Sequence, residues 1–254
     1  MSDFDPKEFF DEKAKRFKDD PELAACGFNH VSNQCMTRVQ KKALQAAIRN
    51  IGGRKTFSGK SLLDLGCGSG RWANLFAELS SSYCGVDISD EMISMCQSFH
   101  PSLLFAAMDG KRIPTDSEMF DFVFVVAVLH HNRRAEQDIL LREISRVIKP
   151  GGYLFLFEAI GSTPGKRVFP RTLKDWTESI SSLGYECVLR RGYHYFPLLA
   201  LFNFFARRIF PAHVSHWRIL KLEAALSPAF SRMLPNQLVR GGRGLMLFRR
   251  TTQA

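Results

Sequence analysis

Leu62-Leu63-Asp64-Leu65-Gly66-Cys67-Gly68-Ser69-Gly70, residues 62–70, is the stretch of sequence that decides the fold of this chain. An apolar run leads directly into three glycines, and the apolar residues that follow recur at the spacing of a helix. This order predicts a buried strand, a tight turn and a helix N-terminus. Glycines at such a turn let a ligand approach the backbone closely, so the segment predicts a ligand site.

The spacing of the glycines restricts what that ligand can be. In the dinucleotide-binding fingerprint the third glycine comes three positions after the second, whereas Gly70 follows Gly68 by two. A P-loop is also excluded, because the turn does not end in Gly-Lys-Ser/Thr. The carboxylate of Asp64 would repel a pyrophosphate but would attract an ammonium group. The turn therefore favours a nucleoside with a positively charged, amino-acid-like end.

On both sides of this turn the apolar pattern alternates between the strand period and the helix period. We expect strands at residues 61–65, 83–86, 103–106, 121–128, 153–157, 187–189 and 244–248. We expect helices at residues 39–51, 72–79, 92–99, 139–148 and 173–183. Alternating units of this kind predict an α/β fold with a Rossmann-like, doubly wound and mostly parallel sheet, with helical additions at the N-terminal and C-terminal sides.

Acidic residues stand at the ends of three consecutive predicted strands. Asp87 closes the second strand about 20 residues after the first glycine, where a carboxylate can accept both hydroxyls of a ribose. Asp109 follows the third strand and can accept from an exocyclic amine. Each one alone has an alternative role as a turn or N-cap residue. Together with Asp64 they mark the edge where open α/β sheets bind ligands.

The charge of the chain is unevenly distributed. Of its 254 residues, 45% are hydrophobic and 24% are charged, which excludes disorder and a disulfide-stapled miniprotein. Residues 1–159 contain 20 basic and 21 acidic side chains, whereas residues 160–254 contain 15 basic and 4 acidic ones. The C-terminal part therefore predicts an anionic partner, namely phosphate, lipid headgroup or nucleic acid, with a merely soluble basic surface as the alternative.

Cysteine usage and hydropathy indicate a cytoplasmic setting. The six cysteines show no two-residue spacing, so neither a zinc site nor a redox dithiol is predicted. The acidic N-terminus lacks the apolar run of a signal peptide. The longest apolar stretch, residues 196–210, is interrupted by polar residues and is too short to span a membrane.

Six motifs, taken together, resemble the class I S-adenosylmethionine-dependent methyltransferases, in particular the type 11 group. The motifs are residues 63–70, Gly85-Val86-Asp87-Ile88-Ser89 with Met92, Asp109 followed by Ile113-Pro114, Phe120-Asp121-Phe122-Val123, Leu129-His130-His131, and residues 142–152. The resemblance covers about residues 36–160. It is specific for cofactor and fold and says almost nothing about the substrate. It also implies a seven-stranded sheet whose last strand is antiparallel.

The resemblance implies S-adenosylmethionine as the cofactor and assigns residues to it. These residues are Arg38, Asp64, Gly66, Cys67, Gly68, Asp87, Ile88, Met108, Asp109, Val126 and Ala127. By this assignment Asp64 and the glycine turn face the methionine end, Asp87 faces the ribose and Asp109 faces the adenine amine. Val126 and Ala127 lie beneath the cofactor. Arg38 is similar to an arginine that holds the methionine carboxylate in some relatives, and a solvated arginine is the alternative.

Methyl transfer from a sulfonium is an in-line displacement, in which proximity and alignment supply much of the catalysis. A general base is needed only when the nucleophile carries a proton, as a hydroxyl does. His131 is the candidate base, because type 11 relatives often carry a histidine there; a role in holding the loop is the alternative. His194, His213 and His216 are further candidates. No metal is expected, because no carboxylate cluster like that of the metal-dependent catechol enzymes is apparent.

We expect residues 1–254 to form a single methyltransferase domain with three parts. Residues 1–57 form a helical N-terminal lid whose phenylalanines close over the cofactor, and residues 58–160 form the cofactor-binding core. Residues 161–254 complete the sheet and add a basic, aromatic helical insertion for the acceptor. The aromatic stretch at residues 196–210 favours one of two structures. It is either an interfacial helix that contacts the inner face of a membrane peripherally or a buried lid.

Three functions fit these observations. The first is methylation, on oxygen in particular, of a small-molecule or lipid-linked acceptor with anionic character. The second is tRNA modification, because residues 127–131 are similar to a segment of the wobble-uridine carboxymethyl enzymes, although no RNA-binding module is recognisable. The third is a catalytically silent, cofactor-binding partner of another protein.

Overall fold

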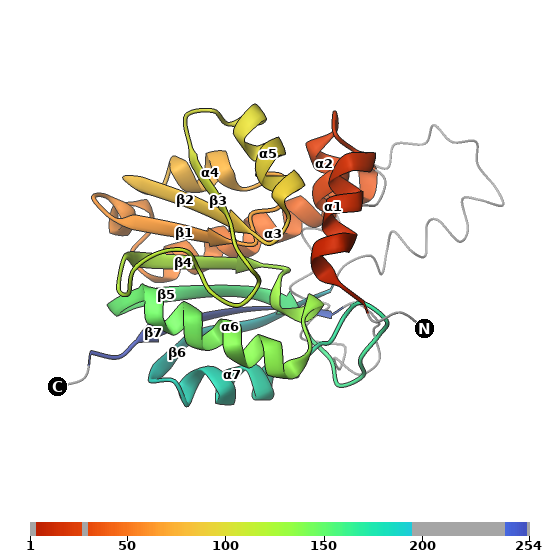
Figure 1. Ribbon diagram of the computed structural model, residues 1–254. Coiled ribbons are helices and arrows are strands. Elements are labelled where there is room, and N and C mark those ends of the chain that lie inside the picture. Colours follow the sequence, from red (N-terminus) through yellow and green to blue (C-terminus); the bar gives the residue numbers. More distant parts are fainter. Residues whose placement is uncertain (1–3, 27–29, 195–241, 253–254) are drawn as a thin grey trace, which may run out of the picture.

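A seven-stranded sheet forms the centre of the molecule, with the strand order β3-β2-β1-β4-β5-β7-β6 (Figure 1). The structure is a computed structural model that describes residues 4–26, 30–194 and 242–252. The strands are β1 (Ser61–Leu65), β2 (Ser82–Asp87), β3 (Leu104–Ala107), β4 (Phe120–Val126), β5 (Ile148–Ala159), β6 (Tyr185–His194) and β7 (Gly242–Arg250). Only β7 runs antiparallel to its two neighbours. The predicted fold class, including the antiparallel last strand, is confirmed.

Helices cover both faces of this sheet. The α-helices are α1 (Pro6–Arg16), α2 (Pro21–Cys26), α3 (His30–Asn50), α4 (Ala73–Ala77), α5 (Asp90–Phe99), α6 (Arg134–Val147) and α7 (Leu173–Ser181). Two 3₁₀ helices, η1 (Arg54–Phe57) and η2 (Leu129–His131), complete the described elements. Buried side chains of α3, α4 and α5 share one core cluster, and those of α6 and α7 share another. The sheet is therefore the middle of three layers.

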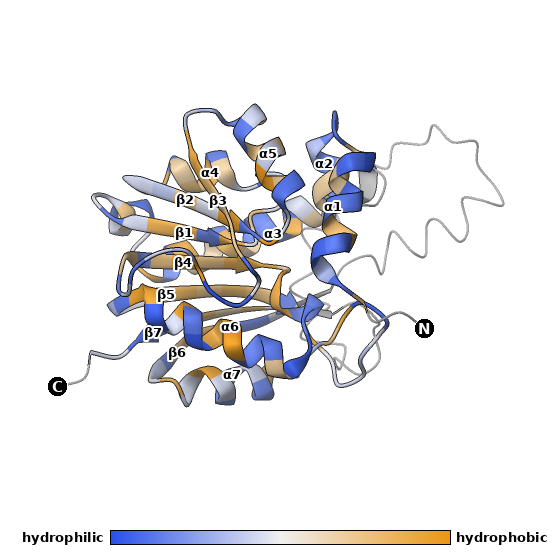
Figure 2. Ribbon diagram, viewed as in Figure 1, coloured by the Kyte–Doolittle hydropathy of each residue, from blue (hydrophilic) through white to orange (hydrophobic). Residues whose placement is uncertain are grey.

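Alternation along the strands assigns each apolar side chain to one of these two cores. Leu62 of β1 packs in the cluster under α3 and α4, whereas Leu63 and Leu65 pack in the cluster under α6 and α7. Strand β4 is apolar on both faces, as the run Phe122 to Val126 predicts for a central strand. Figure 2 shows the hydrophobic colour concentrated along the central strands.

Several boundaries differ from those expected, among them boundaries of β4, β5 and β6. Strand β5 begins at Ile148 instead of residue 153, because Ile148 already pairs with Phe120 and a register shift before Phe122 accommodates the following Pro-Gly-Gly. Strand β6 extends over ten residues, since β7 pairs with it along its whole length. Strand β4 ends at Val126 instead of residue 128, because Ala127 adopts a left-handed conformation with φ of 64°.

Some expectations fall outside the described residues. The aromatic helical stretch expected at residues 196–210 lies there, as do His213 and His216. Within the part of the chain that the structure describes, no helix is both long and apolar enough to cross a membrane.

Candidate functional site

A cavity opens at the carboxyl edge of β1, β2 and β4, where the glycine turn lies. Nine of the residues selected from the sequence line it: Gly66, Cys67, Gly68, Asp87, Ile88, Met108, Val126, Ala127 and His131. These residues come from four different loops that follow strands. The topology of the parallel sheet brings them together, because its strands end at a common edge.

The backbone of the glycine turn is fixed by its neighbours. Gly66 has φ of 72°, and a Cβ there would lie 2.3 Å from Cγ2 of Val128, so both conformation and space require glycine. The amides of Gly66 and Cys67 donate to the carbonyl of Val86, at 2.7 and 3.0 Å. The turn is therefore held against the end of β2, with its backbone facing the cavity.

Asp87 is a buried carboxylate that also lines the cavity. One oxygen accepts from the amide of Gly68 at 2.8 Å and the other from the amide of Ser89 at 3.0 Å. Burial raises the pKa of Asp87, and these backbone donors oppose the rise. Each carboxylate oxygen has a further lone pair, so the side chain can still accept from a ligand hydroxyl.

Asp64 lies buried beneath the turn and does not line the cavity itself. Its Oδ2 accepts from the hydroxyl of Tyr83 at 3.2 Å. Burial raises the pKa of Asp64 to about 7; the charge of Asp87 adds to the rise, and the bond from Tyr83 and the charge of Arg71 oppose it. The unliganded carboxyl is therefore about half protonated at neutral pH.

Two other selected residues lie outside this cavity. Asp109 is exposed, and its Oδ1 accepts from the amides of Lys111 and Arg112 at 2.8 and 2.7 Å, which is the turn-forming role given above as the alternative. Arg38, on α3, lines a neighbouring cavity. Its companion there is Arg71, which lines the first cavity as well. Arg71 was not selected from the sequence, although its place directly after Gly70 was a signal.

His131 ends η2 and presents its ring to the cavity. Its Nδ1 lies 2.8 Å from the carbonyl oxygen of Arg167, which fixes the tautomer with the proton on Nδ1 and leaves Nε2 as an acceptor. Burial, followed by the charge of His130, lowers the pKa of His131 to about 3. The imidazole is therefore neutral at physiological pH.

Glu158, near the end of β5, organises the loop that carries His131. Its carboxylate is fully buried and accepts from the amides of Val128, Leu129 and His130 at 3.0, 2.9 and 3.1 Å, and it contacts Nδ1 of His130. Burial opposes ionisation of Glu158, but His130 and the backbone donors outweigh it and lower the pKa. The sequence analysis missed Glu158; its signal was one charge inside the apolar run of residues 153–160.

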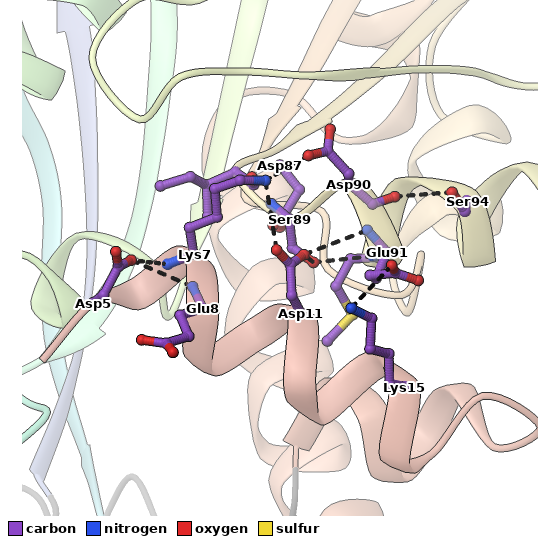
Figure 3. Close-up of polar contacts among 12 residues, drawn as sticks. Asp5, Lys7, Glu8, Asp11, Lys15, Asp87, Ser89, Asp90, Glu91 and Ser94 are labelled. Carbon is purple, nitrogen blue, oxygen red and sulfur yellow. Dashed lines mark hydrogen bonds and ion pairs between the residues drawn. The ribbon is translucent and has the colours of Figure 1, made fainter.

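The N-terminal helix α1 lies across the end of β2 and is held there by polar contacts (Figure 3). Asp11 accepts from the hydroxyl of Ser89 at 2.6 Å and from the amide of Glu91 at 3.4 Å. Lys7 reaches from the same helix to Asp90 at 2.5 Å. These contacts bring Phe10 to the cavity wall, where the centroid of its ring lies 5.3 Å from that of His131.

Among the described residues, no group of three or more His, Cys, Asp or Glu side chains is arranged to hold a metal ion.

Comparison with known proteins gives these residues a context. Residues 63–156 match the family described as "Methyltransferase domain". A phthiotriol/phenolphthiotriol dimycocerosates methyltransferase of Mycobacterium tuberculosis is 36% identical over 102 residues, which are 37% of this chain and 36% of the relative. A tRNA (carboxymethyluridine(34)-5-O)-methyltransferase of Arabidopsis thaliana is 36% identical over 103 residues, 39% of this chain and 24% of the relative. The matches thus span about a third or less of these curated relatives.

Solved structures share the fold at low identity. The complex between the Haloferax volcanii Trm112 methyltransferase activator and a putative methyltransferase contains a chain with a TM-score of 0.62 and 16% identity, covering 98% of this chain and 99% of that chain. A putative methyltransferase from Bacillus halodurans has a TM-score of 0.55 and 18% identity, covering 76% and 94%. Residues 63–156 therefore match a methyltransferase domain, and the chain shares its fold with solved methyltransferase structures.

Proposed function

We propose that this protein transfers a methyl group from S-adenosylmethionine to a hydroxyl of a small-molecule or lipid-linked acceptor. The observation that carries the proposal is the cavity at the carboxyl edge of the sheet, which gathers the glycine turn, Asp87 and His131. We further propose that residues 1–57 act as the lid, 58–160 as the cofactor core and 161–254 as the acceptor part of one domain.

The residues at this cavity fit the chemistry of S-adenosylmethionine. The buried carboxylate of Asp87 retains lone pairs for the ribose hydroxyls, and apolar side chains such as Ile88 and Met108 form the walls where an adenine would pack. The methionine end carries an ammonium and a carboxylate. Asp64 beneath the turn and Arg71 on the wall provide the opposite charge for each, so Arg71 replaces Arg38 as the favoured partner of the carboxylate.

When bound, the cofactor would supply a methyl carbon, activated by a positively charged sulfur, to the acceptor oxygen and would keep the electron pair of the broken carbon–sulfur bond on sulfur. The protein's share of catalysis is to align the acceptor and to receive its proton. Nε2 of His131 receives the hydroxyl proton as the carbon–oxygen bond forms, because the bond from Nδ1 to Arg167 leaves Nε2 unprotonated, while its pKa of about 3 makes it too weak a base to remove that proton beforehand.

The choice of acceptor rests on two relatives and on the charge of the C-terminal part. One relative is named for a lipid substrate and the other for a tRNA. The lipid-like reading is favoured by the aromatic walls beside His131, formed by Phe9 and Phe10. The proposal of a lipid-linked acceptor includes peripheral contact of the protein with a membrane. A tRNA acceptor is the second candidate, supported by the Arabidopsis relative.

Incubation of the chain with methyl-labelled S-adenosylmethionine and fractionated cell extract tests the proposal. We expect the label in organic-extractable or glycan material. Label confined to RNA would establish the second candidate instead. Calorimetry with S-adenosylhomocysteine provides the control for the cofactor site, and a chain that binds the cofactor but transfers no label would be the silent partner protein.

Cofactor affinity should depend on pH through Asp64. Its pKa of about 7 in the free protein should fall when an ammonium group binds, so binding releases a proton. We expect the Kd for S-adenosylhomocysteine to decrease about tenfold between pH 6 and pH 8, as the fraction of ionised carboxylate rises. The Asp64→Asn variant should bind more weakly and lose this dependence. Calorimetry across the pH range is the measurement, and an equally steep profile in the variant would contradict the assignment.

A further inference from the structure

A second cavity, of about 540 Å³, adjoins the first cavity, which the glycine turn, Asp87 and His131 line. It is distinct from the cavity lined by Arg38. It lies between helix α1 and the loop from β5 to α7, which meet where Arg167 packs on Phe9. Five residues line both cavities: Phe10, Ala25, Arg71, Ala127 and His131. A molecule in the second cavity therefore borders two of the residues, His131 and Ala127, that a molecule in the first cavity borders.

Positive charge dominates the walls of this second cavity. The basic side chains are Lys13, Arg16, Arg71, Arg167 and Arg243, against one carboxylate, that of the exposed Glu12. The charge of Arg243 also contributes to the lowered pKa of His131, which places positive potential at the base of the cavity. A cleft with walls of one charge sign concentrates molecules of the opposite sign.

Two of these cations have no carboxylate partner within residues 4–26, 30–194 and 242–252, namely Arg16 and Arg167. Each guanidinium stacks on a phenylalanine ring, Arg16 on Phe17 at 5.2 Å and Arg167 on Phe9 at 4.5 Å from the centroid. Stacking orients a guanidinium and leaves its N–H donors available for a planar or tetrahedral anion. The nearby carboxylate of Asp11 is already engaged with Ser89.

Between these cations the walls are aromatic. The rings of Phe9 and Phe10 meet edge to face at 5.1 Å, and Phe10 meets His131 in the same way at 5.3 Å. Phe17 and Met36 extend the apolar surface away from His131. Such walls take up an apolar body, since aromatic surface is buried favourably against apolar groups.

We propose that this second cavity is the acceptor site and that the acceptor is an apolar molecule bearing a carboxylate or phosphate, held by Arg16 and Arg167. The inference rests on the proposed function and names its substrate class. Arg167 has two roles in it: its carbonyl fixes the tautomer of His131, and its guanidinium holds the anion. The hydroxyl to be methylated then lies at Nε2 of His131, and its proton moves there as the carbon–oxygen bond forms.

Calorimetry on the full chain saturated with S-adenosylhomocysteine tests this inference. The probes are two matched pairs, 2-naphthoate with 2-naphthylmethanol and octyl phosphate with 1-octanol. We expect the anionic member of at least one pair to bind tenfold or more tightly than its neutral partner. The pair that shows the larger ratio distinguishes an aromatic carboxylate from a lipid-type phosphate as the source of the anion.

Two double variants complete the design. R16Q/R167Q should reduce the anionic preference to less than twofold and leave the Kd of S-adenosylhomocysteine unchanged. R54Q/K55Q removes the same charge from η1, ahead of the amino-terminal end of β1, and should keep the preference. Equal binding of charged and neutral probes, a preference retained in R16Q/R167Q, or binding of tRNA that neither anionic probe displaces would overturn the proposal. Failure of S-adenosylhomocysteine to bind the wild-type chain would contradict the proposed function instead.

Discussion

Replacing Asp87 with alanine should weaken the binding of S-adenosylhomocysteine by about 100-fold or more. A hydrogen bond to a charged group contributes about 1.5–3 kcal/mol, and two ribose hydroxyls would lose such a bond. The variant also removes the acceptor of the Gly68 amide, which loosens the turn on the other side of the cavity. Calorimetric titration of the purified variant measures the loss, and a thermal unfolding curve verifies that the variant is folded.

Asp90→Asn is the matched control for Asp87. Asp90 stands three residues away at the start of α5, and its exposed side chain pairs with Lys7 instead of facing the cavity. We expect its affinity to stay within about twofold of wild type, because exposed ion pairs contribute little. If Asp87→Ala binds S-adenosylhomocysteine as tightly as Asp90→Asn does, the assignment of the ribose to Asp87 is wrong.

Glu158→Gln should be among the most destabilising single substitutions in the core. The glutamine amide would direct N–H donors toward a group of backbone donors, and His130 would lose its carboxylate partner. Breaking a buried, fully hydrogen-bonded pair of this kind costs about 3–5 kcal/mol in the free energy of unfolding. For a chain of this size that is a fall in Tm of roughly 6–20 °C, measured by thermal or urea unfolding.

The pH dependence of this effect has a definite sign. The pKa of Glu158 is lowered in the folded protein, so its contribution to stability is complete above the pKa of an unfolded glutamate and is lost as the pH falls through the folded value. The difference between wild type and Glu158→Gln should therefore shrink below about pH 4. Glu178→Gln removes an exposed charge paired with Lys174 and should change stability by less than about 0.5 kcal/mol. A Glu158→Gln variant as stable as Glu178→Gln would contradict the role of the buried carboxylate.

The architecture of the sheet followed from local patterns. Strand β1 was predicted at its observed bounds, because Ser61 to Leu65 is a short apolar run that the glycine turn ends abruptly. The N-cap of α5 is local as well: the hydroxyl of Ser89 accepts from the amide of Met92 at 3.1 Å. Both features depend on residues within a few positions of one another, and such features are encoded locally.

The start of β5 could not be predicted in the same way. Pro150, Gly151 and Gly152 are helix terminators, so the sequence predicts the strand only from residue 153, but Ile148 before them pairs with Phe120 of β4. The backbone of a segment with little intrinsic preference takes the pairing that its neighbour offers. That neighbour lies 28 residues earlier in the chain, so the periodicity of the segment itself gives no sign of the pairing.

The candidate site likewise combines features that the sequence predicts with others that only the tertiary structure shows. The residue types at the strand ends indicated which carboxylates stand at the ligand edge, but not where each side chain points. Asp87 lines the cavity, Asp64 is buried under it, and Asp109 turns away to cap its own loop. Asp109 accepts only from amides two and three residues ahead of it, whereas Asp87 also accepts from Gly68 of the glycine turn and Asp64 accepts from Tyr83 of β2, both distant in the chain.

By itself, the sequence determined the order of strands and helices along the chain, the glycine turn and the edge of the sheet at which the cavity opens, because each follows from residues close together in the chain. Only the tertiary structure decided which long-range partners meet. It paired Glu158 with His130, set the tautomer of His131 through Arg167, and brought α1 across the end of β2. The physical reason is that a buried polar group must find its partners in space, and that search extends over the whole fold.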